Sequence, residues 1–294
     1  MRVSVIGSVK FTHTMIEKLI ASEVTVASII TRKNGSAFHS DFADLTAFAF
    51  RNGIPAMAVT DVNDPATVKF IAALQPDLVF CLGWSQLISV STIRALACPI
   101  IGYHPALLPR NRGRHPIIWA LVLGLGETGS TFFRIDAGVD SGDIVSQRVV
   151  AIREEDDAAT LYGKLSDVAG QQIVKICADA ANGELRYRPQ DPATGNVWRK
   201  RSPADGHIDW RMPSSGIRNL TRALRSPYPG ATALYRGAEC RVWSVRLGAA
   251  THSNIEPGRI LSVCDAWLHL KCGDGTVYIT EHDIPDPRAG QCLT

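Results

Sequence analysis

The strongest chemical signal in this sequence is a histidine and an aspartate in loops that follow two predicted strands. His104 ends an apolar run at 99–103, and Asp140 lies in the glycine-rich loop 136–143 (DAGVDSGD). An imidazole can take up or release a proton near neutral pH, and a carboxylate can orient it. Meeting in one cleft, the pair would suit acyl transfer to an amine. Each residue alone has a plainer explanation, a histidine bonded to a carbonyl group and an aspartate in a turn.

The loop after His104 is rich in arginine. Arg110, Arg112 and Arg114 alternate with Asn111 and Gly113. Guanidinium groups bind phosphates through paired hydrogen bonds, so this loop could hold an anionic substrate. A solvated basic loop is the other interpretation, and the sequence leaves both open.

The first half of the chain predicts an α/β fold. Apolar runs alternate with helical patterns at short spacing, which is typical of βαβ units in a Rossmann-like, mostly parallel sheet with helices on both faces. Ligands bind such sheets at the carboxyl ends of the strands, which is where His104 lies. The turn after the first strand, GSV at 7–9, lacks the glycines of a dinucleotide-binding loop. Strands are expected at 3–6, 24–30, 56–59, 77–82 and 99–103, and helices at 12–21, 44–52, 64–74 and 91–97.

The second half changes character. A helix at 117–123, strands at 130–135 and 144–152 and a long helix at 154–181 come first. A polar, proline-containing stretch then predicts a linker, and short β-rich runs after it predict a small barrel-like domain. The predicted division is residues 1–184 as the catalytic domain, 185–204 as the linker and 205–294 as the C-terminal β-rich domain.

Composition narrows the function classes. The net charge is +3, and from Asp205 onward ten Lys/Arg meet nine Asp/Glu, a balance of +1. A dedicated nucleic-acid binder would carry a larger basic surplus. The seven cysteines form no CxxC or CxxH pair, so we expect no metal site and reduced thiols in the cytoplasm. No apolar run reaches the roughly 18 residues of a membrane span.

Several motifs together resemble one enzyme family. The segment 101–113 (IGYHPALLPRNRG) is similar to the central signature of folate-dependent formyltransferases. That group includes methionyl-tRNA formyltransferase, glycinamide ribonucleotide transformylase and the sugar N-formyltransferases. The resemblance covers nearly the whole chain. It extends through 76–83 (PDLVFCLG), 127–131 (ETGST), 136–143, 201–210 (RSPADGHIDW) and 226–230 (SPYPG).

The resemblance implies a reaction and a set of residues. His104 and Asp140 match the catalytic histidine and aspartate, the donor is N10-formyltetrahydrofolate, the acceptor is a primary amine, and no metal is needed. It also implies folate binding near Leu82, Gly83, Trp84, Asp136 and Gly138, and substrate binding by Arg110, Asn111, Arg112 and Arg114.

One position departs from the family pattern. The family has an asparagine two residues before the histidine, where this chain has Gly102. That amide would stabilise the formyl oxygen, and losing one such donor costs about 10²–10³ in rate unless something replaces it. A backbone N–H, a water or Asn111 could do so.

The acceptor remains open between two branches of the family. The segment 111–121 (NRGRHPIIWAL) looks more like the branch that modifies nucleotide-linked amino sugars, and the +1 balance after Asp205 disfavours tRNA. We therefore expect a cytoplasmic enzyme of lipopolysaccharide or O-antigen biosynthesis, with a homodimer left open. The alternatives are methionyl-tRNA formyltransferase, a catalytically impaired folate- or nucleotide-binding relative, and a hydrolase that releases formate.

Overall fold

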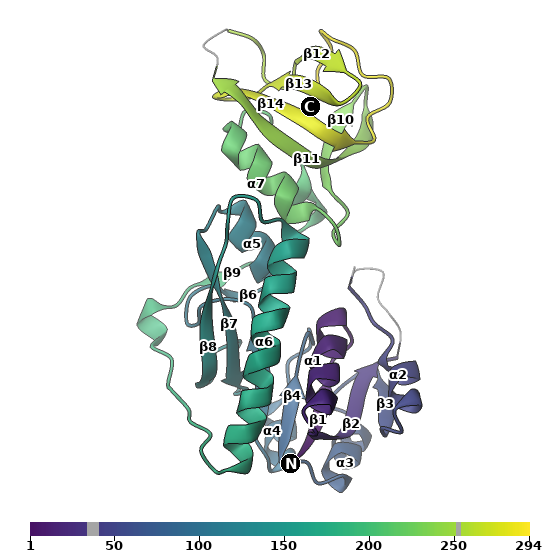
Figure 1. The fold of residues 1–294 in the computed structure, drawn as a ribbon, viewed down its shortest axis with the longest axis vertical. Coiled ribbons are helices and arrows are strands. Elements are labelled where there is room, and N and C mark those ends of the chain that lie inside the picture. Colours follow the sequence, from purple (N-terminus) through teal and green to yellow (C-terminus); the bar gives the residue numbers. More distant parts are fainter. Residues whose placement is uncertain (34–40, 251–253) are drawn as a thin grey trace. The chain divides into compact units, whose positions relative to one another are not determined.

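The chain forms two compact units. The computed structural model describes residues 1–33, 41–250 and 254–294 (Figure 1). Unit 1 comprises Met1–Gly113, Thr128–Val150 and Gly163–Trp198, and unit 2 comprises Arg114–Glu127, Ala151–Tyr162 and Arg199–Thr294. Each unit therefore combines segments that are distant in the sequence.

Unit 1 is built on a mostly parallel sheet, as predicted. Among the described residues this sheet has seven strands, in the order β3-β2-β1-β4-β5-β7-β8. The neighbours from β3 to β5 pair in parallel, and β5 pairs antiparallel with β7. The inner strands are buried on both faces, which explains their continuous apolar runs. The strands are β1 (Arg2–Ile6), β2 (Thr25–Arg32), β3 (Ala56–Val59), β4 (Leu78–Cys81), β5 (Ile100–His104), β7 (Glu127–Arg134) and β8 (Ile144–Ala151).

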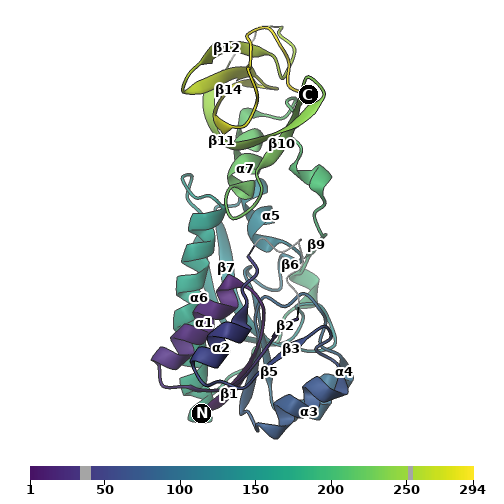
Figure 2. The same cartoon turned by 90° about the vertical axis from the view of Figure 1, so that its right-hand side faces the viewer.

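Helices cover both faces of this sheet, also as predicted (Figure 2). On one face, Ile71 and Leu96 pack with Ile6 of β1 in a buried cluster. On the other, the ring of Phe11 stacks on Tyr103 of β5, with 4.4 Å between ring centroids. The helices are α1 (Lys10–Ala21), α2 (Leu45–Arg51), α3 (Pro65–Ala73), α4 (Val90–Leu96) and α6 (Ala158–Ala181), the last of which begins in unit 2.

Side-chain caps fix where several of these helices begin. Asp44, Asp64 and Ser89 each accept a hydrogen bond from a backbone N–H in the first turn of α2, α3 and α4. Short polar residues before apolar runs are the signal by which such starts are predicted.

Unit 2 contains the predicted C-terminal β-rich domain. Within the described residues its sheet has five antiparallel strands in the order β10-β11-β14-β13-β12. They are β10 (Ala231–Tyr235), β11 (Ala238–Ala250), β12 (Ile260–Cys264), β13 (Trp267–Lys271) and β14 (Gly275–His282).

The remaining elements are divided between the units. Unit 1 contains β6 (Arg112–Gly113), β9 (Val197–Trp198) and the 3₁₀ turn Pro192–Thr194, and unit 2 contains α5 (Pro116–Val122) and the 3₁₀ turn Pro203–Gly206.

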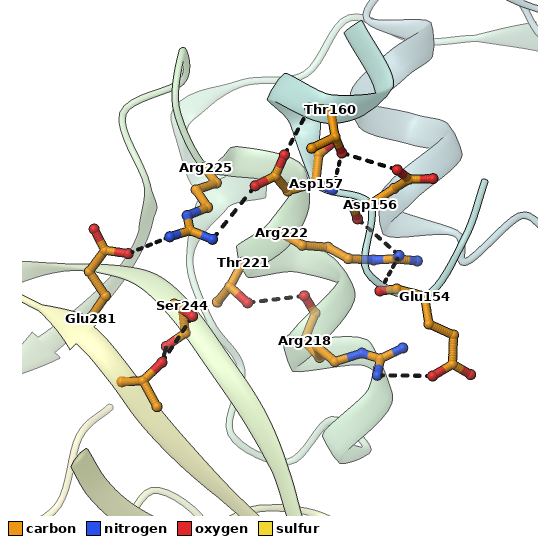
Figure 3. A network of polar contacts seen from close by, with 11 residues as sticks. Glu154, Asp156, Asp157, Thr160, Arg218, Thr221, Arg222, Arg225, Ser244 and Glu281 are labelled. Carbon is orange, nitrogen blue, oxygen red and sulfur yellow. Dashed lines mark hydrogen bonds and ion pairs between the residues drawn. The ribbon is translucent and has the colours of Figure 1, made fainter. Parts of the chain in front are cut away.

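Unit 2 also contains a helix that the sequence analysis did not predict. Helix α7 (Ser214–Leu224) buries Ile217, Leu220 and Leu224, whose spacing places them on one face. Arg218 and Arg222 of the helix, together with Arg225 directly after it, hold the turn before α6 (Figure 3). The Arg222 guanidinium donates to the carbonyl oxygens of residues 153, 154 and 156 at 3.1–3.2 Å.

Two ion pairs flank that central arginine. Arg218 lies 3.6 Å from Glu154, and Arg225 lies 3.6 Å from Asp157 (Figure 3). Asp157 in turn accepts the backbone N–H of Thr160, so it caps the helix. The acidic residues at 154–157 therefore form a bonded turn, and α6 begins at Ala158, later than the predicted 154.

No helix among the residues described is both long enough and apolar enough to span a membrane.

Candidate active site

His104 lies at the carboxyl end of β5 with its side chain only 6% exposed. Its Nε2 is 2.7 Å from the carbonyl oxygen of Asn111. A carbonyl oxygen only accepts, so Nε2 carries the hydrogen in this contact. Its Nδ1 lies 3.5 Å from Oδ2 of Asp140. Nδ1 is therefore the nitrogen that faces the carboxylate.

Asp140 reaches His104 from the loop between β7 and β8. Its Oδ2 also accepts the backbone N–H of Gly113 at 3.0 Å, and its side chain is 20% exposed. Its backbone φ is +52°, in the left-handed region that non-glycine residues adopt at a cost. The histidine and aspartate thus lie together in unit 1.

Asp136 and Gly138 shape this loop from within. Oδ1 of Asp136 accepts from the N–H of Gly138 at 2.9 Å and from the hydroxyl of Ser141 at 2.8 Å. A Cβ atom on Gly142 would lie 1.8 Å from the carbonyl oxygen of Arg134, so only glycine fits there. The glycines of the loop serve close packing as well as turn formation.

The loop after His104 is anchored to the stretch expected to be a linker. The N–H of Asn111 donates to Oδ1 of Asn196 at 2.7 Å, and β6 pairs in parallel with β9. Nε and Nη2 of Arg112 donate to Oε1 of Gln190 at 3.2 and 2.7 Å. Gln190 and Asn196 were missed by the sequence analysis. Two amide side chains in a polar stretch are the only local signal they leave.

The other two predicted substrate residues belong to different units of the chain. Arg110 is exposed on the unit 1 loop. Arg114 belongs to unit 2 and is half-buried.

Leu82, Gly83 and Trp84 follow β4 at the same edge of the sheet as His104. Cys81 of β4 is paired with Gly102 of β5, which sets this register. The carbonyl oxygen of Leu82 accepts from the Thr12 hydroxyl at 2.7 Å, and the Arg32 guanidinium lies 5.0 Å from the Trp84 ring centroid.

Gly83 can only be glycine here. Its φ is +64°, and a Cβ atom would lie 2.2 Å from Cγ2 of Val9. Val9 therefore packs directly against the main chain of Gly83, where a side chain would otherwise lie.

Gly102 stands where the family asparagine would be, and its side-chain space is filled. A Cβ atom there would lie 2.9 Å from Cζ of Phe133 and 3.1 Å from Cγ1 of Ile135. Phe133 is itself buried beside Leu108 and Ile144. An amide at position 102 would require this ring to move.

Buried groups near the site are held neutral. Burial raises the pKa of the Cys81 thiol to about 12, and burial also raises the pKa of Tyr103 beside His104. All seven cysteines are free. In the described ranges, no cluster of three His, Cys, Asp or Glu side chains could hold a metal ion.

Solved structures of other proteins share the fold of this chain over most of its length. An N-formyltransferase from Helicobacter canadensis, in complex with folinic acid and dTDP-3-aminofucose, is 17% identical with a TM-score of 0.69. The match covers 96% of this chain and 99% of that one. Methionyl-tRNA formyltransferase from Clostridium thermocellum is 15% identical with a TM-score of 0.62, over 84% of this chain and 94% of the other.

A third relative is longer. HypX from Aquifex aeolicus, in complex with tetrahydrofolic acid, is 18% identical with a TM-score of 0.66. The match covers 98% of this chain and 45% of HypX, so this chain spans less than half the length of that relative.

Family models match both parts of the sequence. The model described as formyl transferase matches residues 1–177, and the model described as formyl transferase, C-terminal domain, matches residues 200–289. The first alone covers more than half of the chain. This chain belongs to the formyl transferase family.

Proposed function

We propose that this chain transfers a formyl group from N10-formyltetrahydrofolate to the primary amine of a nucleotide-linked amino sugar. The observation that carries the proposal is the pairing of buried His104 with half-buried Asp140, with 3.5 Å between Nδ1 and Oδ2 at the carboxyl edge of the sheet. Family membership supplies the donor class.

Chemistry at the pair follows from its hydrogen bonds. When bound, N10-formyltetrahydrofolate supplies the formyl group, and its N10 takes a proton as the bond to the formyl carbon breaks. The attacking amine forms a new bond to that carbon and must lose one proton. Because Nε2 is tied to the Asn111 carbonyl, Nδ1 of His104 is the position that gains and releases this proton. Asp140 stabilises the charged ring while it holds the proton.

The edge beside His104 fits a pterin. Gly83 has no side chain to shield its backbone polar groups, which can read an amide-like ring edge, whereas the carbonyl oxygen of Leu82 is already bonded to Thr12. We propose that residues 82–84 and the loop with Asp136 and Gly138 bind the folate ring. Arg110, exposed on the unit 1 loop, is the proposed contact to the diphosphate, and Arg112 is largely committed to Gln190.

The amino-sugar acceptor is favoured over tRNA by two observations. The charge balance of +1 after Asp205 is small for a surface that must neutralise tRNA phosphates. The Helicobacter canadensis relative, whose complex contains an amino-sugar nucleotide, matches over nearly the full length of both chains.

Product analysis tests the proposal. The protein is incubated with N10-formyltetrahydrofolate and either a panel of amine-bearing nucleotide sugars or methionyl-tRNA, and mass spectrometry looks for a gain of one formyl group. We expect at least one sugar to be formylated, and His104→Asn to abolish this while retaining tetrahydrofolate binding. Folate turnover without any acceptor would instead indicate a formate-releasing hydrolase. Formylation of methionyl-tRNA alone would indicate the tRNA enzyme, and binding without turnover an impaired relative.

A further inference from the structure

We propose that Gln190 is a positioning residue. It links the loop that follows His104 to the loop that carries Asp140, and so keeps the imidazole and the carboxylate in contact. The proposal rests on the function proposed above, because it names a residue of that same site. Gln190 lies in the polar stretch before β9 and belongs to unit 1, like both loops.

The amide of Gln190 bonds to both loops at once. Oε1 accepts from Nε and Nη2 of Arg112 at 3.2 and 2.7 Å. Nε2 donates to the carbonyl oxygens of Asp140 and Gly142 at 2.9 and 2.7 Å. A guanidinium only donates and a carbonyl oxygen only accepts, so the amide has one orientation that satisfies all four contacts.

These bonds close a ring around the catalytic pair. Asn111, directly before Arg112, accepts the hydrogen on Nε2 of His104. Gly113, directly after Arg112, donates its N–H to Oδ2 of Asp140. Arg112 is therefore the centre of a segment that touches both catalytic side chains, and Gln190 ties that centre to the main chain of Asp140.

The Asp140 loop needs such support. Asp140 has φ +52°, a conformation that persists where surrounding contacts over-determine it. Gln190 supplies two hydrogen bonds to this loop, one at the strained residue itself and one at Gly142. Gln190 touches neither His104 nor the carboxylate of Asp140 in these contacts, so its influence passes through the loops.

Two substitutions separate the halves of the amide. Gln190→Glu keeps an acceptor for Arg112 but replaces the N–H donors with an oxygen facing two carbonyl oxygens. Gln190→Met keeps the length and removes both functions. Gln171 of α6 is a matched control, because its Oε1 accepts from Arg148 at 2.8 Å on an exposed face of unit 1. Gln171→Glu should therefore behave like the unmodified protein.

Steady-state kinetics with the amino-sugar nucleotide that the protein formylates give the first readout. We expect both Gln190 variants to lose about tenfold to hundredfold in kcat, with KM for the folate donor changed less than threefold. The pH–rate profile should change, because a displaced loop alters the contact between the imidazole and the carboxylate that handle the transferred proton. A merely structural role would lower stability and leave that profile in place.

Histidine side-chain NMR gives a second readout that needs no substrate. The ring-nitrogen chemical shifts of His104, assigned with the His104→Asn variant, should change in both Gln190 variants and stay unchanged in Gln171→Glu, because they report the contacts of Nε2 with Asn111 and of Nδ1 with Asp140. This measurement still decides the proposal if no acceptor is formylated. Folded Gln190 variants with unchanged His104 ring-nitrogen shifts, or with kcat within twofold of the unmodified protein, would overturn it; should one variant fail to fold, the other decides.

Discussion

Replacing Gly102 by alanine tests whether Phe133 fills the place of the family asparagine. The added methyl carbon would lie 2.9 Å from Cζ of Phe133, closer than real contacts of this kind. Gly102 does not have a positive φ, so the backbone itself accepts alanine. Without a clash, such a change stabilises a protein by about 0.4–1 kcal/mol. Overpacking a core costs about 1–3 kcal/mol, so we expect a net loss of about 1 kcal/mol.

Thermal unfolding measures this difference against a matched glycine. Gly163 lies exposed inside α6, and nothing lies within 4 Å of a Cβ atom there. Gly163→Ala should raise the melting temperature, because alanine is favoured in a helix by up to about 1 kcal/mol. Gly102→Ala should lower it by about 2–4 °C. The two alanine substitutions should thus have opposite signs.

A double variant identifies the clashing side chain. Phe133→Leu removes the ring atoms that the new methyl group meets, so Gly102→Ala should cost less in that background, with a coupling of about 0.5–3 kcal/mol. Additive effects, or a Gly102→Ala variant as stable as the unmodified protein, would refute the steric argument. Gly102→Asn is larger still, so we expect it to lose stability and to restore no activity unless Phe133 is also reduced.

Three further outcomes follow from other parts of the structure. Asp140→Asn keeps the acceptor for the Gly113 N–H but removes the charge beside His104. We therefore expect kcat to fall about a hundredfold and the pH–rate profile to change. An unchanged profile would show that the Asp140 carboxylate does not act through His104. Cys81 should resist thiol reagents at pH 8 in the native protein while exposed Cys264 reacts, as read by mass spectrometry of labelled peptides, because burial raises the Cys81 pKa to about 12. Burial lowers the pKa of His269 and of His282, so the unfolded chain takes up protons first as the pH falls below about 6.5. Urea unfolding should therefore show a stability that is present at pH 7 and is progressively lost towards pH 5. The loss should be smaller in His269→Phe.

The sequence was sufficient for the sheet and for the place of His104. Parallel strands are buried on both faces, so their apolar runs stand out, and His104 ends one of them. Helix α7 was missed although its signal is in the sequence, since Ile217, Leu220 and Leu224 recur at helical spacing. The short strands that follow it drew the prediction for this part of the chain towards β structure.

The contacts around the candidate site could not be derived from local patterns. Gln190 bonds to residues 48 to 78 positions away, and Asn196 bonds to Asn111 across 85 positions. The ring of Phe133 fills the space at Gly102 only because β5 and β7 pair in a particular register. Such facts depend on tertiary structure, which a single sequence does not state.

The composition of unit 2 has a practical consequence for protein engineering. Because 114–127 and 151–162 belong to the same unit as 199–294, a chain cut near residue 198 would leave the turn at 153–157 without the arginines of α7. Exchanging the C-terminal portion between relatives would likewise break the contacts of Arg218, Arg222 and Arg225 unless the two inserted segments were exchanged with it. Chimeras of this chain should therefore be designed by spatial unit and not by a single cut in the gene.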